Sequence, residues 1–355
     1  MIRLECDYSE GAHPRIMESL LRTNLEQTIG YGEDPYCERA ADLIKQACGV
    51  SAADVHFLVG GTQTNTTVIS SILRPHQGVV AAESGHINVH ESGAIEATGH
   101  KVLALPSADG KIRAAQVEAL CLEHLNDPSR EHMVQPGMVY VSQSTEKGTI
   151  YSRRELRELS KVCRRFELPL FMDGARLGYA LAAEGNDLDL KEIARCCEVF
   201  YIGGTKVGAL FGEAVVITAE KLKKDFRYLI KQKGGMLAKG RLLGIQFETL
   251  FQKDLYLEIS KHAVELALHL REGLKTLGYS FLSESPTNQQ FPILPDTLLR
   301  YLEKNYIFSF WAKPNDRQTA VRICTSWATP GEHIKQLLED IRRFEADTPS
   351  NLSVQ

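Results

Sequence analysis

The chain has 355 residues, of which 43% are apolar and 8% aromatic, enough to form the cores of about two units of roughly 150 residues each. Its 41 lysines and arginines and 45 aspartates and glutamates give a formal net charge of −4, which excludes the strongly basic surface that nucleic-acid binding requires. No run approaches the roughly 20 apolar residues that cross a bilayer, and Arg3, Glu5 and Asp7 stand where a signal peptide has its apolar core. We therefore expect a soluble cytoplasmic protein that binds neither nucleic acid nor membrane.

The first part of the chain alternates helical patterns with short apolar runs. Residues 37–48 carry apolar side chains at helical spacing, and Gly49 suits the left-handed end of that helix. Seven apolar runs then predict strands at 55–59, 78–83, 101–106, 137–143, 168–173, 198–204 and 212–218. Because these runs are continuously apolar, they indicate a mainly parallel sheet with both faces covered by helices. Such sheets bind ligands beyond the carboxyl ends of their strands.

The pattern changes after about residue 219. A long helix is predicted at 255–278, and shorter helices and strands follow. The predicted strands lie at 279–283, 305–312 and 319–327, and the predicted helices at 296–304 and 331–345. We therefore expect a large domain over 1–250, whose N-terminal segment can pack with the second domain. A small α+β domain follows over 251–345, and then a frayed tail at 346–355.

Two charged residues stand at the end of the run 168–173. Asp173 ends the run, and Arg176 follows three residues later. A carboxylate among apolar neighbours must be paired or functional, because an isolated buried charge is too costly. A local ion pair between Asp173 and Arg176 is the alternative to a functional role.

Lys206 follows the next apolar run, among small residues such as Gly204 and Gly208. Lysine is seldom buried without a partner. This position is therefore a candidate for a desolvated amine of lowered pKa that forms Schiff bases. A loop lysine that faces water is the alternative.

A strand that leads through Gly60, Gly61 and Thr62 into a helix presents backbone amides to a phosphate. This segment matches neither the dinucleotide-binding pattern nor the P-loop. His86 and His90 have the spacing of a metal pair on a helix. Because no third ligand stands nearby, we expect no metal, and a structural role is the alternative for both histidines.

Together these segments supply the parts that hold pyridoxal 5′-phosphate. They are a phosphate cradle, a flat ring in His86, a carboxylate in Asp173 for the pyridinium nitrogen, and an amine in Lys206 for the Schiff base. Their order along the chain fits as well. We therefore expect pyridoxal 5′-phosphate as the cofactor.

The motifs around these residues resemble the low-specificity threonine aldolases, which are β-eliminating lyases of fold type I. In chain order the motifs are CDYSEGAHPRI, YGEDPY, GGTQTN, GHINVHESGA, MDGARLG, GGTKVGA, KGGM and VRICTSW. The resemblance implies the aspartate-aminotransferase-like α/β fold. It also implies cleavage of a β-hydroxy-α-amino acid, of the threonine or allo-threonine type, to glycine and an aldehyde.

The resemblance also implies roles for residues that hold the cofactor. Lys206 becomes the Schiff-base lysine, and Asp173 the partner of the pyridinium nitrogen. Gly61 and Thr62, helped by Thr205, would hold the phosphate.

Further residues are implied to contact the substrate. His86 would stack on the cofactor ring, and His86 or a water that it positions would take the proton of the β-hydroxyl. Arg176 matches an arginine that contacts the substrate carboxylate or the cofactor beside it, and Arg322 matches one that clamps that carboxylate through two parallel hydrogen bonds. A surface ion pair is the alternative for Arg322.

The chain departs from the family pattern at two positions. Cys6 stands where family members usually have a serine, so the substrate contact that this serine makes in the family need not be kept in this chain. Glu146 stands where many have a histidine, which bears on the stereopreference at the β-carbon and on the reaction itself. A β-elimination from another amino acid uses the same cofactor site and stays open, and a pyridoxal-phosphate-binding protein without turnover is a remote alternative.

The resemblance implies a homodimer or homotetramer with shared active sites. The stretch around Lys231, Lys233 and Gly234 resembles the segment that reaches a neighbouring subunit's phosphate in the family. A solvated run of charges is the alternative for these lysines.

Overall fold

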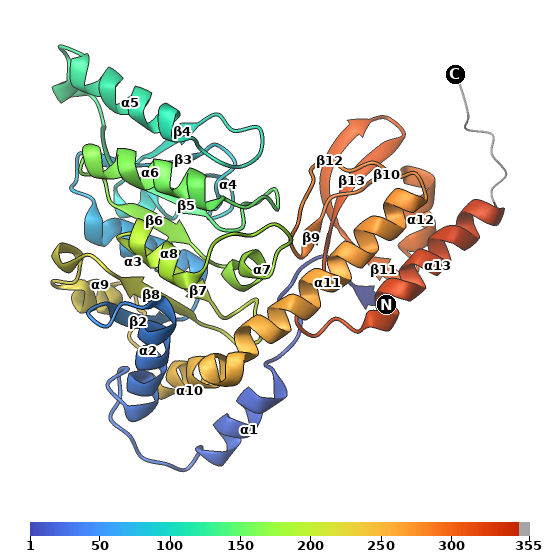
Figure 1. Cartoon of the computed structure of the whole chain (residues 1–355), viewed down its shortest axis with the longest axis horizontal. Coiled ribbons are helices and arrows are strands. Elements are labelled where there is room, and N and C mark those ends of the chain that lie inside the picture. Colours follow the sequence, from blue (N-terminus) through green and yellow to red (C-terminus); the bar gives the residue numbers. More distant parts are fainter. Residues whose placement is uncertain (348–355) are drawn as a thin grey trace.

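The computed structural model describes residues 1–347, and its centre is one seven-stranded sheet with helices on both faces (Figure 1). The spatial order of the strands is β2-β8-β7-β6-β5-β3-β4. Their bounds are β2 (Asp54–Leu58), β3 (Gln77–Ala82), β4 (Val102–Leu105), β5 (Gln135–Ser142), β6 (Leu170–Asp173), β7 (Val199–Gly203) and β8 (Glu213–Ile217). All seven predicted strands are confirmed. The sheet is mixed, because β8 runs antiparallel to both of its neighbours, β2 and β7.

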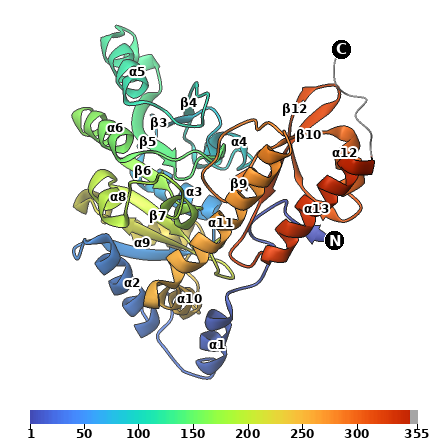
Figure 2. The ribbon, with the colours of Figure 1, turned by 45° about the vertical axis from the view of Figure 1, so that its right-hand side comes forward.

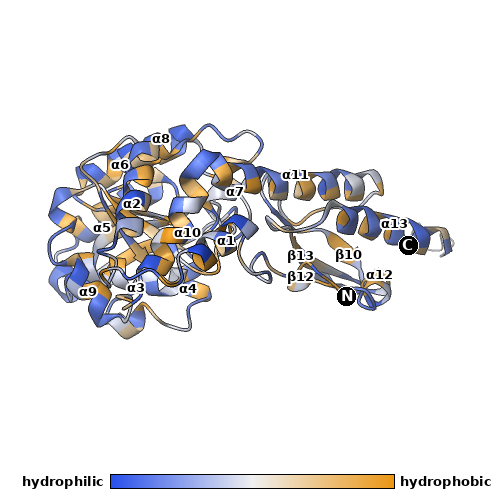
Figure 3. Ribbon diagram, turned by 90° about the horizontal axis from the view of Figure 1, so that it is seen from below, coloured by the Kyte–Doolittle hydropathy of each residue, from blue (hydrophilic) through white to orange (hydrophobic). Residues whose placement is uncertain are grey.

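Helices cover both faces of this sheet and bury their apolar sides against it (Figure 3). One face carries α1 (Pro14–Arg22), α2 (Pro35–Cys48), α5 (Ala114–Asn126), α6 (Arg153–Arg165), α7 (Leu177–Leu181), α8 (Leu190–Cys196) and α10 (Arg241–Phe251). The other face carries α3 (Gly61–Ile72), α4 (His86–Val89) and α9 (Phe226–Gln232). Short 3₁₀ turns lie at Glu96–Thr98, Arg130–His132, Glu220–Leu222 and Gln252–Asp254. The two covering layers explain why the strands are apolar throughout.

The predicted helix at 37–48 is confirmed as α2, which begins two residues earlier than predicted. The Asp34 side chain accepts hydrogen bonds from the backbone N–H groups of Tyr36 and Cys37, each at 3.0 Å, and Pro35 fits the first helical turn. The helix ends at Gly49, whose φ of 66° is the left-handed conformation expected there.

The long helix α11 (Leu255–Thr276) leads from the sheet into the smaller part of the molecule (Figures 1 and 2). That part contains β9 (Gln289–Gln290), β10 (Ile293–Pro295), β12 (Ser309–Asn315) and β13 (Gln318–Cys324), which pair antiparallel. The helices α12 (Asp296–Leu302) and α13 (Gly331–Asp347) pack on them. At the other end of the chain, β1 (Ile2–Arg3) pairs in parallel with β11 (Tyr306–Ile307), so the N-terminus lies in this smaller part.

Two details of the smaller part differ from the sequence prediction. The predicted strand at 279–283 is wrong: Phe281 forms an isolated bridge with Pro292. Beyond it the chain leaves this pairing, because the Ser283 hydroxyl donates to the Lys147 carbonyl of the loop after β5 at 2.6 Å. The predicted strand at 305–312 divides into β11 and β12, which pair with different partners.

The domain boundaries stay a prediction, although α13 continues through Asp347 into the predicted tail. Residues 348–355 of that tail lie outside the described residues. Within residues 1–347, no helix combines the length and the apolar character needed to cross a bilayer.

Candidate active site

Residues from four loops meet at the carboxyl edge of the parallel strands. Asp173 ends β6, Lys206 follows β7, Gly61 begins α3 after β2, and His86 begins α4 after β3. All four line one cavity of about 280 Å³. The structure therefore brings together residues that the sequence predicted separately, at the edge where open α/β sheets bind their ligands.

Asp173 lies at the base of this cavity and is 5% exposed. Its carboxylate accepts hydrogen bonds from the Tyr140 hydroxyl at 2.6 Å, from the Asn65 amide at 3.2 Å and from the backbone N–H of Ala175 at 3.0 Å. Burial raises the pKa of Asp173, but the charge of His86 and the bond from Tyr140 outweigh it, so the pKa lies below its ordinary value. Asp173 is therefore a buried, ionised carboxylate.

Arg176 pairs with Asp7 and not with Asp173. Its Nε lies 2.7 Å from Oδ2 of Asp7, and its Nη2 lies 3.0 Å from Oδ1. The Asn288 amide donates a third hydrogen bond to Asp7, at 2.9 Å. Burial raises the pKa of Asp7, but the charges of Arg176 and Lys206 outweigh it and lower the pKa to about 2. The predicted alternative, a local ion pair between Asp173 and Arg176, is therefore wrong.

Lys206 presents its amine to the cavity. Its backbone carbonyl accepts a hydrogen bond from the Tyr179 hydroxyl at 2.5 Å, which fixes the loop. Burial, followed by the charge of Arg176, lowers the pKa of the amine. A lysine of lowered pKa is the nucleophile that carbonyl chemistry requires, because it loses its proton more readily.

The N-terminus of α3 lies open to the same cavity. Gly60 precedes the helix and provides no side-chain cap, so the first N–H groups of α3 are available to an anion. A Cβ built on Gly61 would lie 3.2 Å from the Tyr201 hydroxyl, which leaves little space for any other residue. Thr62, at the first turn, is exposed.

Thr205 is already engaged beside this helix end. Its hydroxyl donates to Oε1 of Glu213 at 2.8 Å and accepts from the backbone N–H of Gly212 at 3.0 Å. Oε2 of Glu213 accepts from the N–H of Gly204 at 3.2 Å. Burial raises the pKa of Glu213 to about 8. Thr205 and Glu213 therefore both line the cavity, and the carboxyl group of Glu213 is largely protonated at neutral pH.

A chain of hydrogen bonds joins His86 to Asp173. The Nδ1 atom of His86 lies 2.8 Å from Oε1 of Glu91, and the Asn65 amide donates to that same oxygen at 2.8 Å as well as to Asp173. Burial lowers the pKa of His86, but the bond to Glu91 and the charge of Asp173 outweigh it and raise the pKa. His90 is exposed, and its ring lies 5.7 Å from that of His86.

A second cavity, of about 640 Å³, opens outward from the first and shares His86, Arg176 and Lys206 with it. Arg322 lines this outer cavity. Its Nη2 donates to the Glu5 carbonyl at 3.1 Å, and its guanidinium lies 5.6 Å from the ring centre of Trp311. Its Nε is buried and unpaired among the described residues, where Arg322 forms no ion pair. The predicted alternative of a surface ion pair is therefore wrong for Arg322.

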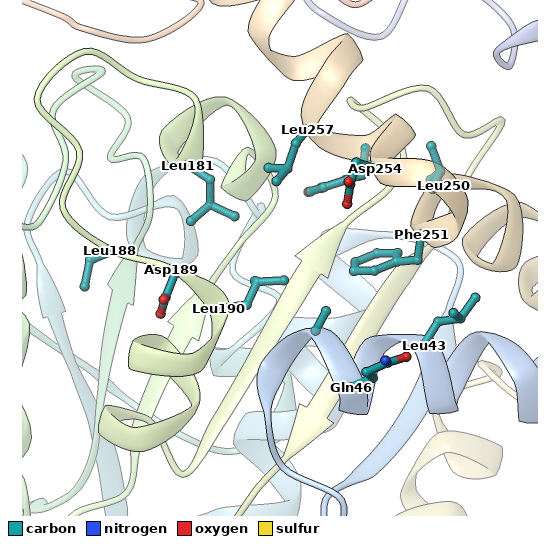
Figure 4. Close-up of a pocket in the computed structure, with 12 residues that line it drawn as sticks. Leu43, Gln46, Leu181, Leu188, Asp189, Leu190, Leu250, Phe251, Asp254 and Leu257 are labelled. Carbon is teal, nitrogen blue, oxygen red and sulfur yellow. The ribbon is translucent and has the colours of Figure 1, made fainter.

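Another cavity, of about 470 Å³, lies between α2, α8, α10 and α11 and has a different character (Figure 4). Its wall is mainly leucine, with Phe251 beside them, and Asp189 caps α8 by accepting the N–H of Glu192 at 2.7 Å. Because no lysine or histidine lines it, this cavity does not provide the chemistry of the polar one.

The comparison with protein families agrees with this geometry. Residues 7–296 match the model of the family described as beta-eliminating lyase. The chain belongs to the beta-eliminating lyase family.

Several relatives of this beta-eliminating lyase are threonine aldolases. A low specificity L-threonine aldolase of Pseudomonas aeruginosa is 28% identical over 95% of this chain and 96% of its own. The solved structure of a Leishmania major threonine aldolase superposes with a TM-score of 0.94 at 44% identity, over 97% of this chain and 99% of the other. A Thermus thermophilus aspartate aminotransferase, with a TM-score of 0.69 and 17% identity over 97% of this chain and 91% of the other, shows the shared fold alone. The predicted fold type I is therefore confirmed.

The sequence analysis of this beta-eliminating lyase missed three residues of the site. Glu213 is a charged residue at the start of the apolar run 212–218, and it was overlooked because the search was for charged residues after a run, as with Asp173. Glu91 was visible beside His90 but had no predicted role, and Asn65 has no signal in a single sequence. Their importance follows only from the contacts with His86, Asp173 and Thr205.

Proposed function

We propose that this protein is a low-specificity threonine aldolase, which cleaves a β-hydroxy-α-amino acid to glycine and an aldehyde. The observation that carries this proposal is the 44% identity to the Leishmania major threonine aldolase over 97% of the chain. The site supports it, because an unpaired amine, a buried carboxylate and an anion-binding helix end line one cavity.

The residues of the inner cavity fit pyridoxal 5′-phosphate, the cofactor that the family implies. Two buried polar atoms of its wall lack a partner within the described residues, namely Oγ of Ser144 and Oε2 of Glu146. Buried polar groups are almost always hydrogen-bonded in native proteins. Unpaired atoms around a polar cavity therefore favour a polar ligand there.

The cofactor supplies an aldehyde that captures amines and a ring that accepts the electrons of a bond broken at Cα. Lys206 would be the amine that holds this aldehyde. Asp173 accepts a hydrogen bond from the protonated ring nitrogen, and its lowered pKa keeps it ionised for this role. Gly61 and Thr62 hold the phosphate through the N–H groups of the first turn of α3.

Thr205 and Glu213 complete the wall beside the phosphate. With Glu213 protonated, its carboxyl group can donate to Thr205, whose hydroxyl is then free to donate to the phosphate. His86, whose Nδ1 is held by Glu91 at 2.8 Å, would lie against the cofactor ring.

Two arginines serve the substrate carboxylate. Arg322 binds it directly, because its guanidinium has no acidic partner in residues 1–347. The charge of Arg176 is balanced by Asp7, with which it forms an ion pair. Arg176 therefore orients the substrate carboxylate by hydrogen bonding and adds no net charge to the site.

The deciding experiment is a product assay on the purified protein loaded with pyridoxal 5′-phosphate. We expect glycine and an aldehyde from threonine, allo-threonine and phenylserine. Serine, cysteine, tyrosine and tryptophan, assayed in parallel for ammonia and pyruvate, should give little of either. Ammonia and pyruvate without glycine would contradict the aldolase and favour β-elimination, and no product from any of these amino acids would contradict both.

A further inference from the structure

The cleavage of a β-hydroxy-α-amino acid requires a base for the proton of the β-hydroxyl group. His86 faces the cavity, but its Nδ1 atom is held 2.8 Å from Glu91. Its raised pKa keeps protons on both ring nitrogens up to a higher pH than in an ordinary histidine. A doubly protonated imidazole has no lone pair with which to accept another proton. His86 can therefore accept a proton only through Nε2, because Glu91 occupies its Nδ1.

The Glu146 side chain lines the same space. Its Oε1 atom accepts hydrogen bonds from the backbone N–H of His86 at 3.0 Å and from the Ser142 hydroxyl at 2.8 Å. These two bonds tie the loop after β5 to α4 and fix the orientation of the carboxyl group. The other oxygen, Oε2, is buried and has no hydrogen-bond partner among the described residues.

The position of Glu146 suits a group that contacts the substrate. It lines both the inner and the outer cavity, as do Lys206 and Arg176. A substrate whose amine replaces Lys206 and whose carboxylate reaches Arg322 must pass through the space that the two cavities share. Its β-hydroxyl is then within the part of the site that Glu146 faces.

We propose that the carboxylate of Glu146 is the base that accepts the proton of the substrate's β-hydroxyl. This inference rests on the proposed aldolase function. The electron pair of the O–H bond forms the carbonyl π bond of the aldehyde, and the pair of the broken Cα–Cβ bond stays with Cα. Cα then takes up one proton and Glu146 releases one, so that the products are glycine and aldehyde with no net change in protons.

The charges around Glu146 favour this role. Burial and the nearby Asp173 raise its pKa, while the charge of His86 acts in the opposite direction. Asp173 from β6 and His86 from α4 act on its charge, Glu146 in turn acts on Tyr140 and Tyr151, and Lys206 lines the same cavity. A carboxylate of raised pKa is a stronger base than an ordinary one, and a pKa nearer the working pH favours general base catalysis.

The test compares two reactions of one variant, E146Q. The glutamine keeps an oxygen to accept the bonds from His86 and Ser142 but cannot accept a proton. We expect the kcat for threonine cleavage to fall about 100-fold or more, as for the loss of a general base. Exchange of the α-proton of glycine with deuterated water, which involves no β-hydroxyl, should stay within about threefold of wild type.

The other outcomes contradict the proposal. Threonine cleavage within about threefold of wild type would remove Glu146 as the base. An equal loss of cleavage and glycine exchange would show a merely structural role. If E146Q does not fold, E146D decides, because it keeps the charge but withdraws the carboxylate by one methylene: cleavage lowered at least tenfold more than glycine exchange supports the proposal, and an equal loss of both overturns it.

Two controls separate this test from that of the proposed function. The exposed Glu123 on α5 provides the matched variant E123Q, which should cleave threonine at the wild-type rate. In wild type, kcat should fall as the pH drops and Glu146 becomes protonated, and the residual activity of E146Q should lack this fall. If the wild-type protein cleaves no β-hydroxy amino acid, the proposed aldolase function is wrong. This result would be obtained before any variant is made, so the two failures are distinguishable.

Discussion

Asp7 and Arg176 lie 169 positions apart in the sequence and form a buried ion pair with two contacts, at 2.7 and 3.0 Å. Asp7 belongs to the segment that follows β1, and Arg176 follows β6 of the large sheet. The pair therefore fixes the N-terminal segment over the active-site cavity, where Tyr8 forms part of the wall. Removing one partner would leave the other charge buried without compensation.

Asp7→Asn should lower the free energy of unfolding by about 3–5 kcal/mol, the usual cost of breaking a buried ion pair. Urea denaturation monitored by circular dichroism measures this loss. The matched control is Glu265→Gln, which breaks an exposed pair with Lys261 and should cost less than about 1 kcal/mol. The pKa of Asp7 falls to about 2 on folding. The ionised Asp7 therefore stabilises the folded state at any pH above its ordinary pKa, and this stabilisation is lost as the pH falls toward 2. Equal losses in the two variants would refute this account.

Lys206→Ala should abolish covalent attachment of the cofactor. The wild-type protein loaded with pyridoxal 5′-phosphate should be yellow, and reduction with borohydride should leave the cofactor on the peptide that contains Lys206. Mass spectrometry of the digested protein locates the adduct. The exposed Lys161 on α6 provides a control variant, Lys161→Ala, which should keep the adduct. An adduct on the same peptide of the Lys206 variant would show that the assignment is wrong.

Arg322→Lys should lower kcat/KM for threonine about 10- to 100-fold. A lysine cannot form two parallel hydrogen bonds with a carboxylate, and one hydrogen bond to a charged group contributes about 1.5–3 kcal/mol. The cofactor absorbance should not change, because Arg322 lies in the outer cavity. Steady-state kinetics of this variant should be compared with Arg317→Lys, at an exposed site between β12 and β13. A wild-type kcat/KM in the Arg322 variant would exclude Arg322 from substrate binding.

Glu213→Gln should change how the stability of the cofactor-free protein depends on pH. The pKa of Glu213 is about 8 in the folded protein, above its ordinary value of 4.5, so between these two pH values the folded state holds a proton that the unfolded state has lost. Unfolding free energy therefore falls as the pH rises through this window, by at most about 1.4 kcal/mol per pH unit. Glutamine does not titrate, so the variant should lack this fall. Parallel curves of Tm against pH for the two proteins would argue against a protonated Glu213.

The protein should assemble as a homodimer or a larger homo-oligomer. Leu21, Leu25 and Ile29 are 79%, 93% and 66% exposed, and they lie in and after α1, which projects at the bottom of Figure 1. Exposed apolar side chains that gather in one segment mark an interaction site. Lys231, which resembles a residue that reaches a neighbour, lies 5.0 Å from the ring of Tyr31 in the same segment.

The double variant Leu25→Glu, Ile29→Glu should therefore dissociate to monomers, as measured by light scattering. Leu125→Glu on α5, at a position that is 46% exposed, is the matched control and should not change the mass. A wild-type protein that is an active monomer at low concentration would contradict the prediction of shared active sites.

The amino-acid sequence was enough to predict the strands of the large sheet and three of the residues that line the inner cavity. The runs that became β6 and β7 are apolar because helices cover both faces of the sheet, and this burial makes a following Asp173 or Lys206 conspicuous. Gly61 was identified for a local reason as well, because a glycine turn before a helix is visible in a few consecutive residues.

The pairing of the charged groups could be seen only in the three-dimensional structure. Arg176 looked like a partner of Asp173, three residues away, but it pairs with Asp7 at the far end of the chain. The sequence showed Glu146 only as a departure from the family pattern. The structure places its carboxylate in a hydrogen bond with the N–H of His86, sixty positions earlier. Local periodicity records whether a residue is buried, whereas the order of strands in the sheet determines which distant side chains share a cavity, and that order depends on packing across the whole chain.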